Sequence, residues 1–300
     1  MNTKVNLAGV ELKNPVMTAS GTFGSGMEYS EFVDLNRLGA VVTKGVANVP
    51  WPGNPTPRIA ETYGGMINAI GLQNPGIDVF CERDIPFLQK YDTKIIVNVC
   101  GKSEKDYLDV VERLSDEPVD MLEINISCPN VKEGGIAFGQ CASNIEHITS
   151  AIKKIAKQPV IMKLSPNVTD ITEMARAAEA GGADVLSLIN TITGMKIDIN
   201  RQTFAVANKT GGLSGPAVKP VAVRMVYQVA NAIKVPIIGM GGIATAEDAI
   251  EMILAGASAV AVGTANFHNP GVTMEIVDGI EAYMKQHGFN TVQEMVGLVK

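Results

Sequence analysis

The fold is most clearly encoded in Met121-Leu122-Glu123-Ile124-Asn125-Ile126-Ser127-Cys128-Pro129-Asn130. The stretch opens as an apolar strand, Met121–Ile124, and ends abruptly in polar groups. Asn125 and Asn130 supply amide donors and acceptors, and between them Cys128 stands beside a proline that stiffens the turn. Because α/β enzymes keep their active sites at the carboxyl ends of buried strands, this stretch predicts a catalytic face there.

Apolar runs of this kind recur along the chain and alternate with helical patterns. We expect strands at Pro15–Ala19, Ala40–Thr43, Lys94–Val97, Met121–Ile124, Val160–Met162, Asp184–Leu188, Pro236–Gly239 and Ala259–Val262. We expect helices near Glu28–Leu35, Gly76–Gln89, Ser103–Leu114, Asn144–Ala156, Ile171–Ala180, Val218–Ile233, Ala246–Ala255 and Val272–Lys285. Continuous apolar runs indicate strands buried on both faces, hence a parallel sheet. The series predicts a (β/α)8 TIM barrel, with a doubly wound sheet as the alternative.

Composition bounds the class of protein. The 300 residues are 46% hydrophobic, which is ample for a large core, and no linker marks a second domain, so we expect one barrel over residues 1–300. The net charge of -6, without a basic stripe, argues against a nucleic-acid surface. No apolar run approaches the roughly 18 residues of a membrane span, and no leader pattern is visible. We expect a cytoplasmic protein with reduced thiols.

Two connections are too long for simple turns. Residues 45–75 are rich in glycine and proline, and residues 191–216 end in Gly211-Gly212-Leu213-Ser214-Gly215. Long connections in a compact domain are usually lids, binding loops or disordered segments. We therefore expect a barrel with long loops at the face that carries the active site.

Polar residues follow the predicted strands at the point where each ends. They are Ser20-Gly21, Lys44-Gly45, Asn98, Asn125, Lys163, Asn190-Thr191, Gly241-Gly242 and Gly263-Thr264. In a barrel these positions converge on one mouth. Because the set holds lysines and asparagines but neither aspartate nor glutamate, it suits an anion with several hydrogen-bonding edges, and we expect no metal.

The last two strand ends are more specific. Gly239-Met240-Gly241-Gly242-Ile243 and Val262-Gly263-Thr264 stand where barrels commonly bind phosphate through backbone N–H groups. Glycine also lets a backbone approach a ligand closely, although it can equally serve only to turn the chain. Two such loops at the expected places favour phosphate.

The cysteines and histidines differ in what they indicate. No C-x-x-C pair is present, so a zinc ribbon or self-contained iron–sulfur site is not expected. A lone cysteine is usually an inert buried residue, and we interpret Cys81 and Cys100 in that way and leave Cys141 open. Cys128, in a loop between two asparagines, is the candidate catalyst. The histidines are interpreted as structural or solvated: His147, His268 and His287.

Several motifs together resemble dihydroorotate dehydrogenase. They are Asn125-Ile126-Ser127-Cys128-Pro129-Asn130, Asn68-Ala69-Ile70-Gly71-Leu72-Gln73-Asn74, Ser20-Gly21-Thr22-Phe23-Gly24 and Lys44-Gly45. The resemblance runs over nearly the full length. It implies a (β/α)8 flavoprotein that binds FMN and oxidises dihydroorotate to orotate in pyrimidine (UMP) biosynthesis.

The resemblance also implies a subclass. Cys128, rather than serine, resembles the soluble class 1 enzymes, and residues 131–139 resemble the class 1B catalytic subunit. Those enzymes form a homodimeric core and pair with a subunit that carries FAD and a [2Fe–2S] cluster and passes electrons to NAD. Class 1A, which uses fumarate, is the alternative, but it typically has a Pro-Gly-Lys-Pro-like continuation that this chain lacks.

The site that the resemblance implies coincides with the strand ends. FMN would be held by Ser20, Gly21, Lys44, Gly45, Asn98, Asn125, Lys163, Ile189, Gly215, Gly241, Gly242, Gly263 and Thr264. The pyrimidine and its carboxylate would be held by Lys44, Asn68, Ala69, Ile70, Gly71, Leu72, Asn125, Asn130, Asn190 and Thr191. Cys128 would remove a proton from C5 while C6 passes hydride to the flavin, and the loop 130–141 would act as a lid.

Three rivals stay open. One is a flavin barrel that acts on a different pyrimidine. Another is a flavin-free aldolase that uses Lys163 as a Schiff-base amine, with the glycine loops on a substrate phosphate. The third is a non-catalytic ligand-binding barrel. The chain has neither a Rossmann glycine motif nor clustered cysteines, so an NAD-linked enzyme would need its FAD and iron–sulfur groups on a partner.

Overall fold

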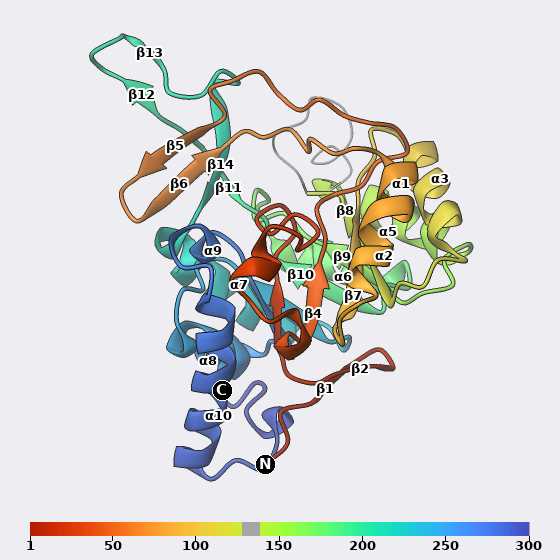
Figure 1. Ribbon diagram of the computed structural model, residues 1–300, viewed down its shortest axis with the longest axis vertical. Coiled ribbons are helices and arrows are strands. Elements are labelled where there is room, and N and C mark those ends of the chain that lie inside the picture. The colour runs from red at the N-terminus through yellow and green to blue at the C-terminus, as the bar shows by residue number, and fades with distance from the viewer. Residues whose placement is uncertain (128–138, 300) are drawn as a thin grey trace.

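The computed structural model describes residues 1–127 and 139–299, and its centre is a closed parallel barrel (Figure 1). Its strands pair in chain order: β3 (Val16–Thr18), β4 (Ala40–Val42), β7 (Lys94–Val99), β8 (Met121–Asn125), β9 (Val160–Lys163), β10 (Val185–Leu188), β15 (Ile237–Met240) and β16 (Ala259–Val262). The ring closes where β16 pairs with β3. The predicted (β/α)8 barrel is therefore confirmed, and the doubly wound sheet is wrong, because that sheet would be open.

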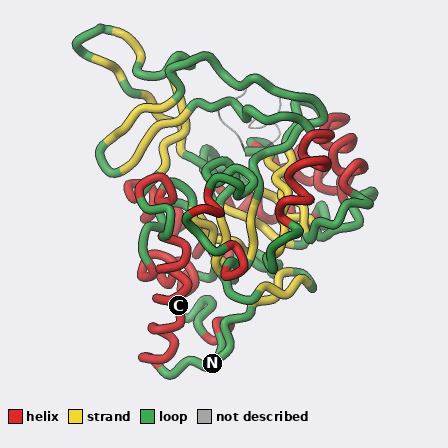
Figure 2. Tube along the Cα trace, viewed as in Figure 1, coloured by secondary structure: helices red, strands yellow, loops and turns green. Residues whose placement is uncertain are grey.

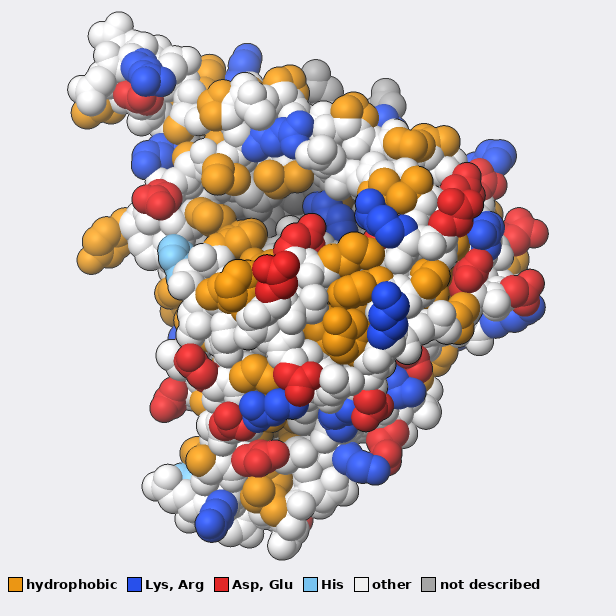
Figure 3. Space-filling view, viewed as in Figure 1, with side chains coloured by type: hydrophobic (Ala, Val, Ile, Leu, Met, Phe, Trp, Pro, Cys, Tyr) orange, Lys and Arg blue, Asp and Glu red, His pale blue; other side chains and the backbone are white. Residues whose placement is uncertain are grey.

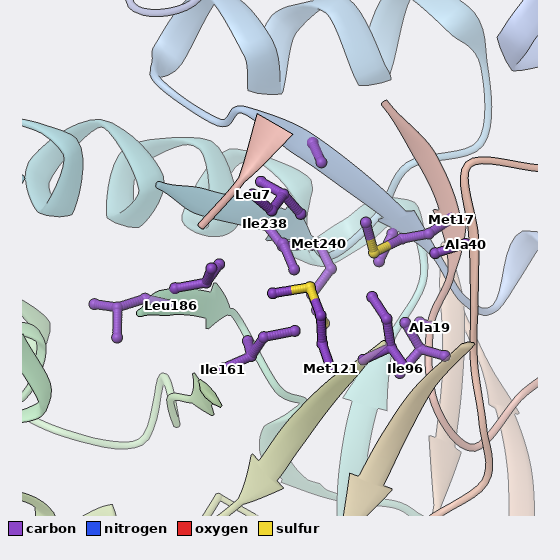
Figure 4. Packing of buried hydrophobic residues seen from close by; sticks show 14 of the residues in the cluster. Leu7, Met17, Ala19, Ala40, Ile96, Met121, Ile161, Leu186, Ile238 and Met240 are labelled. Atoms are coloured by element: carbon purple, nitrogen blue, oxygen red, sulfur yellow. The ribbon is translucent and has the colours of Figure 1, made fainter. Parts of the chain in front are cut away.

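Alternate residues of each strand fill the barrel. Figure 4 shows Met17, Ile96, Met121, Ile161 and Ile238 pointing toward one another from different strands, and all five are buried. This apolar plug closes the lower part of the barrel, as in other folds of this kind. Burial of both strand faces explains why the sequence shows continuous apolar runs.

Most predicted helices form on the outside of the barrel. They are α3 (Glu104–Leu114), α5 (Ala142–Lys153), α6 (Ile171–Ala180), α7 (Lys219–Ala230), α8 (Ala246–Ala255) and α10 (Val272–His287), with a short α9 (Ala265–His268). The helix predicted at Gly76–Gln89 is α1 (Ile77–Val79), a π-helical turn (Phe80–Asp84) and α2 (Ile85–Leu88). Capping boxes at Ser103 and Thr245 set where α3 and α8 begin.

The helix predicted at Glu28–Leu35 is wrong. Two separate 3₁₀ turns, Tyr29–Glu31 and Leu35–Arg37, take its place. Asp34 lies between them in an extended conformation, and its side chain accepts a hydrogen bond from the backbone N–H of Asn36. Aspartate competes with helix in this way, so the first turn ends before Asp34 and a new one starts after it.

The two long connections form a second sheet. Residues 45–75 contribute β5 (Ile59–Thr62) and β6 (Gly65–Asn68), and residues 191–216 contribute β11 (Ile192–Met195) and β14 (Thr210–Ser214). They pair antiparallel in the order β11-β14-β6-β5, and we call this sheet the roof. Figures 1 and 2 show the roof beyond the carboxyl ends of the barrel strands, with the hairpin β12 (Ile197–Asp198)–β13 (Thr203–Phe204) projecting from it. Pairing between distant segments was not predictable from either loop alone.

The amino-terminal segment forms a small hairpin of β1 (Val5–Leu7) and β2 (Val10–Leu12), which the sequence did not predict. Its inward side chains, Leu7 and Leu12, are fully buried. In the described part of the chain, no helix has both the length and the apolar character needed to cross a membrane.

Candidate active site

A cavity of about 760 Å³ lies between the barrel mouth and the roof. Figure 3 shows it as a hollow in one face, with hydrophobic side chains along its edge. This volume lies in the range of small-molecule and cofactor sites. The wall contains nearly every described residue expected there: Ser20, Gly21, Lys44, Gly45, Asn68, Ile70, Gly71, Leu72, Asn98, Asn125, Lys163, Ile189, Asn190, Thr191, Gly215, Gly241, Gly242, Gly263 and Thr264.

One described residue of the expected set, Ala69, is not in this wall. Ala69 is buried beside Ile67 and Val206 behind the roof, because alternation turns Met66 and Asn68 toward the cavity and their neighbours away. Cys128 and Asn130 lie outside the described residues, as does most of the loop 130–141 predicted to be a lid. The prediction that Cys128 is catalytic therefore stays a prediction.

The bottom of the cavity is a buried polar layer that rests on the apolar plug. We call it the floor, and it consists of Asn98, Glu123, Asn125, Lys163 and Ser187, each at most 4% exposed. Asn125 Nδ2 donates to Asn98 Oδ1 at 3.3 Å. Asn98 Nδ2 donates to Glu123 Oε2 at 2.6 Å. Because buried polar groups must find partners, this network fixes the direction of each amide.

The network continues toward the undescribed loop. Asn190 Nδ2 donates to Ser127 Oγ at 2.7 Å, and Ser127 Oγ donates to Asn125 Oδ1 at 3.1 Å. The phenolic O–H of Tyr107, from α3, donates to the backbone carbonyl of Asn125 at 2.9 Å. The residue that precedes Cys128 in the chain is thus held by two asparagines that line the cavity.

Lys163 brings a cation to the floor. Its Nζ donates to Ser20 Oγ at 3.1 Å and lies 3.6 Å from Glu123 Oε2. Glu123 was missed by reasoning confined to the strand ends, since it sits two residues before the end of β8. The signal that could have found it is the period-two alternation of Met121, Glu123 and Asn125, which places all three on the barrel interior.

The glycine loops lie against the cavity as expected. Gly241 has φ +120° and Gly242 φ +78°, a region that side chains rarely adopt. A Cβ on Gly242 would stand 2.8 Å from the backbone N of Lys219, so the loop also packs tightly on α7. These two glycines therefore have a structural reason to be present whether or not they bind phosphate. Thr264 Oγ1 donates to Ser214 Oγ at 2.8 Å and ties this side of the mouth to the roof.

The upper wall is apolar and was not predicted. Ile59, Met66 and Leu213 reach the cavity from three roof strands, and Phe267 and His268 reach it from α9. His268 is exposed, which agrees with a solvated histidine, but its place on the cavity wall was not expected. Since these residues depend on how the roof is assembled, no local pattern marks them.

None of the three described thiols, Cys81, Cys100 and Cys141, lines the cavity. Burial raises the pKa of Cys81 to about 11, which fits the inert role expected of it. Cys141 is exposed at the start of α5, where a hydrogen bond with Ser143 lowers its pKa. Cys100 is fully buried beside Ala47 and Trp51. Outside 128–138, no His, Cys, Asp and Glu side chains gather in threes as metal ligands do.

Barrel and cavity define the class: a (β/α)8 enzyme whose mouth suits an anionic small molecule with several hydrogen-bonding edges. The family model described as dihydroorotate dehydrogenase matches residues 2–284. The chain therefore belongs to the dihydroorotate dehydrogenase family, whose members are oxidoreductases.

Individual relatives agree with this assignment. The dihydroorotate dehydrogenase B (NAD(+)), catalytic subunit, of Lachnoclostridium phytofermentans is 73% identical over 300 residues, 100% of both chains. The protein of the same name from Alkaliphilus metalliredigens is 66% identical and covers 99% of this chain and 98% of its own. A crystal structure of the Eimeria tenella enzyme in complex with ferulenol has a TM-score of 0.83 at 27% identity, covering 99% of this chain and 88% of that one.

Proposed function

We propose that this chain is the catalytic subunit of an NAD-linked dihydroorotate dehydrogenase, which oxidises (S)-dihydroorotate to orotate with FMN in the cavity. The observation that carries the proposal is the floor: a buried lysine beside a network of asparagines, below a cavity of about 760 Å³. Membership of the family supports the same reaction in pyrimidine (UMP) biosynthesis.

The donor set fits FMN. The loops at Gly241–Gly242 and Gly263–Thr264 would meet its phosphate, as the corresponding loops of many barrels do. Lys163, Asn98 and Asn125 would meet the polar edge of the flavin ring, where a cation stabilises the charge that reduction brings. When bound, FMN would supply the acceptor for the hydride from C6 of the substrate.

The asparagines suit the substrate. Asn68 reaches the cavity from the roof, and Asn125 and Asn190 reach it from the barrel. An amide side chain offers both a donor and an acceptor, which matches the alternating N–H and C=O edges of a pyrimidine. Lys44, on the same wall, would pair with the carboxylate. This contact would favour dihydroorotate over pyrimidines that lack the carboxylate.

Cys128 is proposed as the base that removes the C5 proton. Its chain neighbour Ser127 is held by Asn125 and Asn190. The base would therefore enter the site next to the asparagine side chains that are proposed to bind the substrate. An unperturbed thiol has a pKa of about 8.5, and the thiolate is the active form. Activity should therefore rise with pH through that region.

Electrons are proposed to leave through a partner. The names of the relatives specify a catalytic subunit and NAD(+), which implies a second subunit in those proteins. We extend this to a homodimeric core that pairs, in the cytoplasm, with a subunit carrying FAD and a [2Fe–2S] cluster.

The visible spectrum of the purified chain tests the proposal. We expect a flavin band near about 450 nm, bleached anaerobically by dihydroorotate and not by dihydrouracil, which lacks the carboxylate. Bleaching by both would favour the flavin barrel for another pyrimidine. A colourless protein with a borohydride-stable adduct on Lys163 would replace the proposal with the aldolase.

Acceptor specificity is tested separately. The isolated chain should reduce a dye with dihydroorotate but form almost no NADH, and the partner subunit should restore NADH formation. Robust NADH formation by the chain alone would contradict the class 1B assignment. Strong reduction of fumarate would move the chain to class 1A.

A further inference from the structure

Glu123 is a buried acid to which the proposed reaction gives no role. It lies inside the barrel on β8 and is 1% exposed. Asn98 Nδ2 donates to its Oε2 at 2.6 Å, and Ser187 Oγ donates to its Oε1 at 2.8 Å. Lys163 Nζ stands 3.6 Å from Oε2. Each of its oxygens thus accepts from a neutral donor, and one of them also faces an ammonium.

This arrangement is costly unless it is complete. Ions buried this deeply are retained only with a counter-charge and satisfied hydrogen bonds, and removal of one partner leaves the other buried and unpaired. A hydrophobic pair would fill the barrel more simply, as Met121 and Ile161 do one layer below (Figure 4). The position of the carboxylate beneath the cavity therefore points to a role in the site rather than in packing.

Glu123 contacts two residues of the cavity wall. Asn98 is held between Glu123 and Asn125, and Lys163 between Glu123 and Ser20. The carboxylate does not itself line the cavity. Its negative charge nevertheless lies close enough to offset the positive charge that Lys163 presents to a bound ligand, because charges in a buried site are weakly screened.

We propose that Glu123 is a positioning residue that aims Lys163 and Asn98 and sets how strongly the floor favours reduced over oxidised flavin. The inference rests on the proposed function, since it takes FMN as the ligand of this cavity. With Glu123 present, its negative charge balances the positive charge of Lys163. Without the charge of Glu123, the floor carries a net positive charge and binds the more negative reduced flavin more tightly than the oxidised flavin.

The test is the reduction potential of bound FMN in Glu123→Gln, a substitution that keeps the shape and removes the charge. The ratio of reduced-flavin to oxidised-flavin affinity should rise by about tenfold. For a two-electron couple this corresponds to a potential about 30 mV higher. Dye equilibration measures the potential, and titration of apoprotein with FMN measures the affinity, so neither readout depends on turnover.

Two matched variants separate charge from packing. Ser187→Ala removes one hydrogen bond to Glu123 and keeps the charge. The ratio of reduced-flavin to oxidised-flavin affinity should therefore stay within about twofold of the wild-type ratio. Glu123→Asp keeps the charge with a shorter side chain and should restore most of the wild-type potential. A shift of equal size in all three variants would show that Glu123 acts only through packing and would overturn the proposal.

A double-mutant cycle covers the case in which Glu123→Gln retains no FMN. Lys163→Met and Glu123→Gln each leave one buried partner unpaired. The loss of unfolding temperature in the double variant should therefore be smaller than the sum of the losses in the two single variants. Additive losses would overturn the pairing. Wild-type protein without flavin affinity would overturn the proposed function and this inference together, whereas flavin bound with an unchanged potential in Glu123→Gln would overturn this inference alone.

Discussion

The floor and the roof of the cavity are built in opposite ways. The floor side chains come from strands of one barrel ladder and are almost completely buried. The roof comes from two connections that meet only in space, and Asn68 bonds to the carbonyl of Gly212 across 144 positions of sequence. Its surface is open, with Ile59 58% exposed and Tyr63 fully exposed.

This contrast separates rigidity from access. A buried, fully bonded layer opens only with global unfolding, whereas an exposed sheet with few buried contacts belongs to the less stable part of a protein. We infer that the floor governs the cofactor and the chemistry, while the roof governs entry and retention of substrate. Substitutions in the two regions should therefore affect different measured quantities.

The largest effect is expected of Cys128→Ala, a substitution next in the sequence to Ser127. Loss of a general base typically lowers the rate by about 10² to 10⁴. FMN content and orotate binding should be unchanged, because the asparagines that hold Ser127 remain. Stopped-flow reduction of the flavin by dihydroorotate measures the rate.

Cys128→Ser is the companion variant. It should recover a small part of the activity at high pH, since a hydroxyl is a poorer base. Near-normal flavin reduction in the alanine variant at neutral pH would remove Cys128 from the mechanism.

Lys163→Ala should have the next largest effect. It deletes the floor's cation and leaves Glu123 buried without its counter-charge. A charge-assisted hydrogen bond contributes about 1.5 to 3 kcal/mol, so the Kd for FMN should rise at least about tenfold. Fluorescence titration of apoprotein with FMN measures this Kd.

Lys157→Ala, which removes an exposed lysine paired with Asp116, is the control and should leave the Kd unchanged. Equal FMN binding by wild type and Lys163→Ala would contradict a role for the floor in holding the cofactor.

Gly212→Ala should disturb the roof alone. A Cβ there would stand 1.9 Å from Thr191 Oγ1, so β14 or Thr191, which lines the cavity, must shift. We expect KM for dihydroorotate to rise about tenfold with FMN content retained, since small misplacements in a site are expensive. Gly194→Ala, on the neighbouring strand β11, would meet only ordinary contacts at 3.7 and 3.8 Å and should behave as wild type. Loss of FMN in Gly212→Ala would show that roof and floor are not separable.

The same contrast explains how far the sequence could be interpreted. Lys163 and Asn125 were predictable because they close apolar runs, and parallel strands bring such ends together. Glu123 was overlooked because it lies inside a run, although alternation from Met121 marks its face. The roof strands were not predictable, since β6 pairs with β14 from a different loop, and the two loops are brought together only by the tertiary fold. The burial of Ala69 beside Ile67 and Val206 was not predictable for the same reason, because the roof decides which way its side chain faces.

The smallest effect on activity is expected at the thiols away from the cavity. The lowered pKa of exposed Cys141 and the raised pKa of Cys81, about 11, predict that iodoacetamide at pH 8 labels Cys141 at least about tenfold faster. Labelling of Cys81 should accelerate only as the pH approaches 11, because the thiolate is the reactive form. Peptide mass spectrometry follows both sites.

Cys141→Ser should change dihydroorotate oxidation by less than about twofold, since surface substitutions away from a site cost little. A large loss would mean that Cys141 belongs to the active site and that Cys128 is not the sole reactive thiol there.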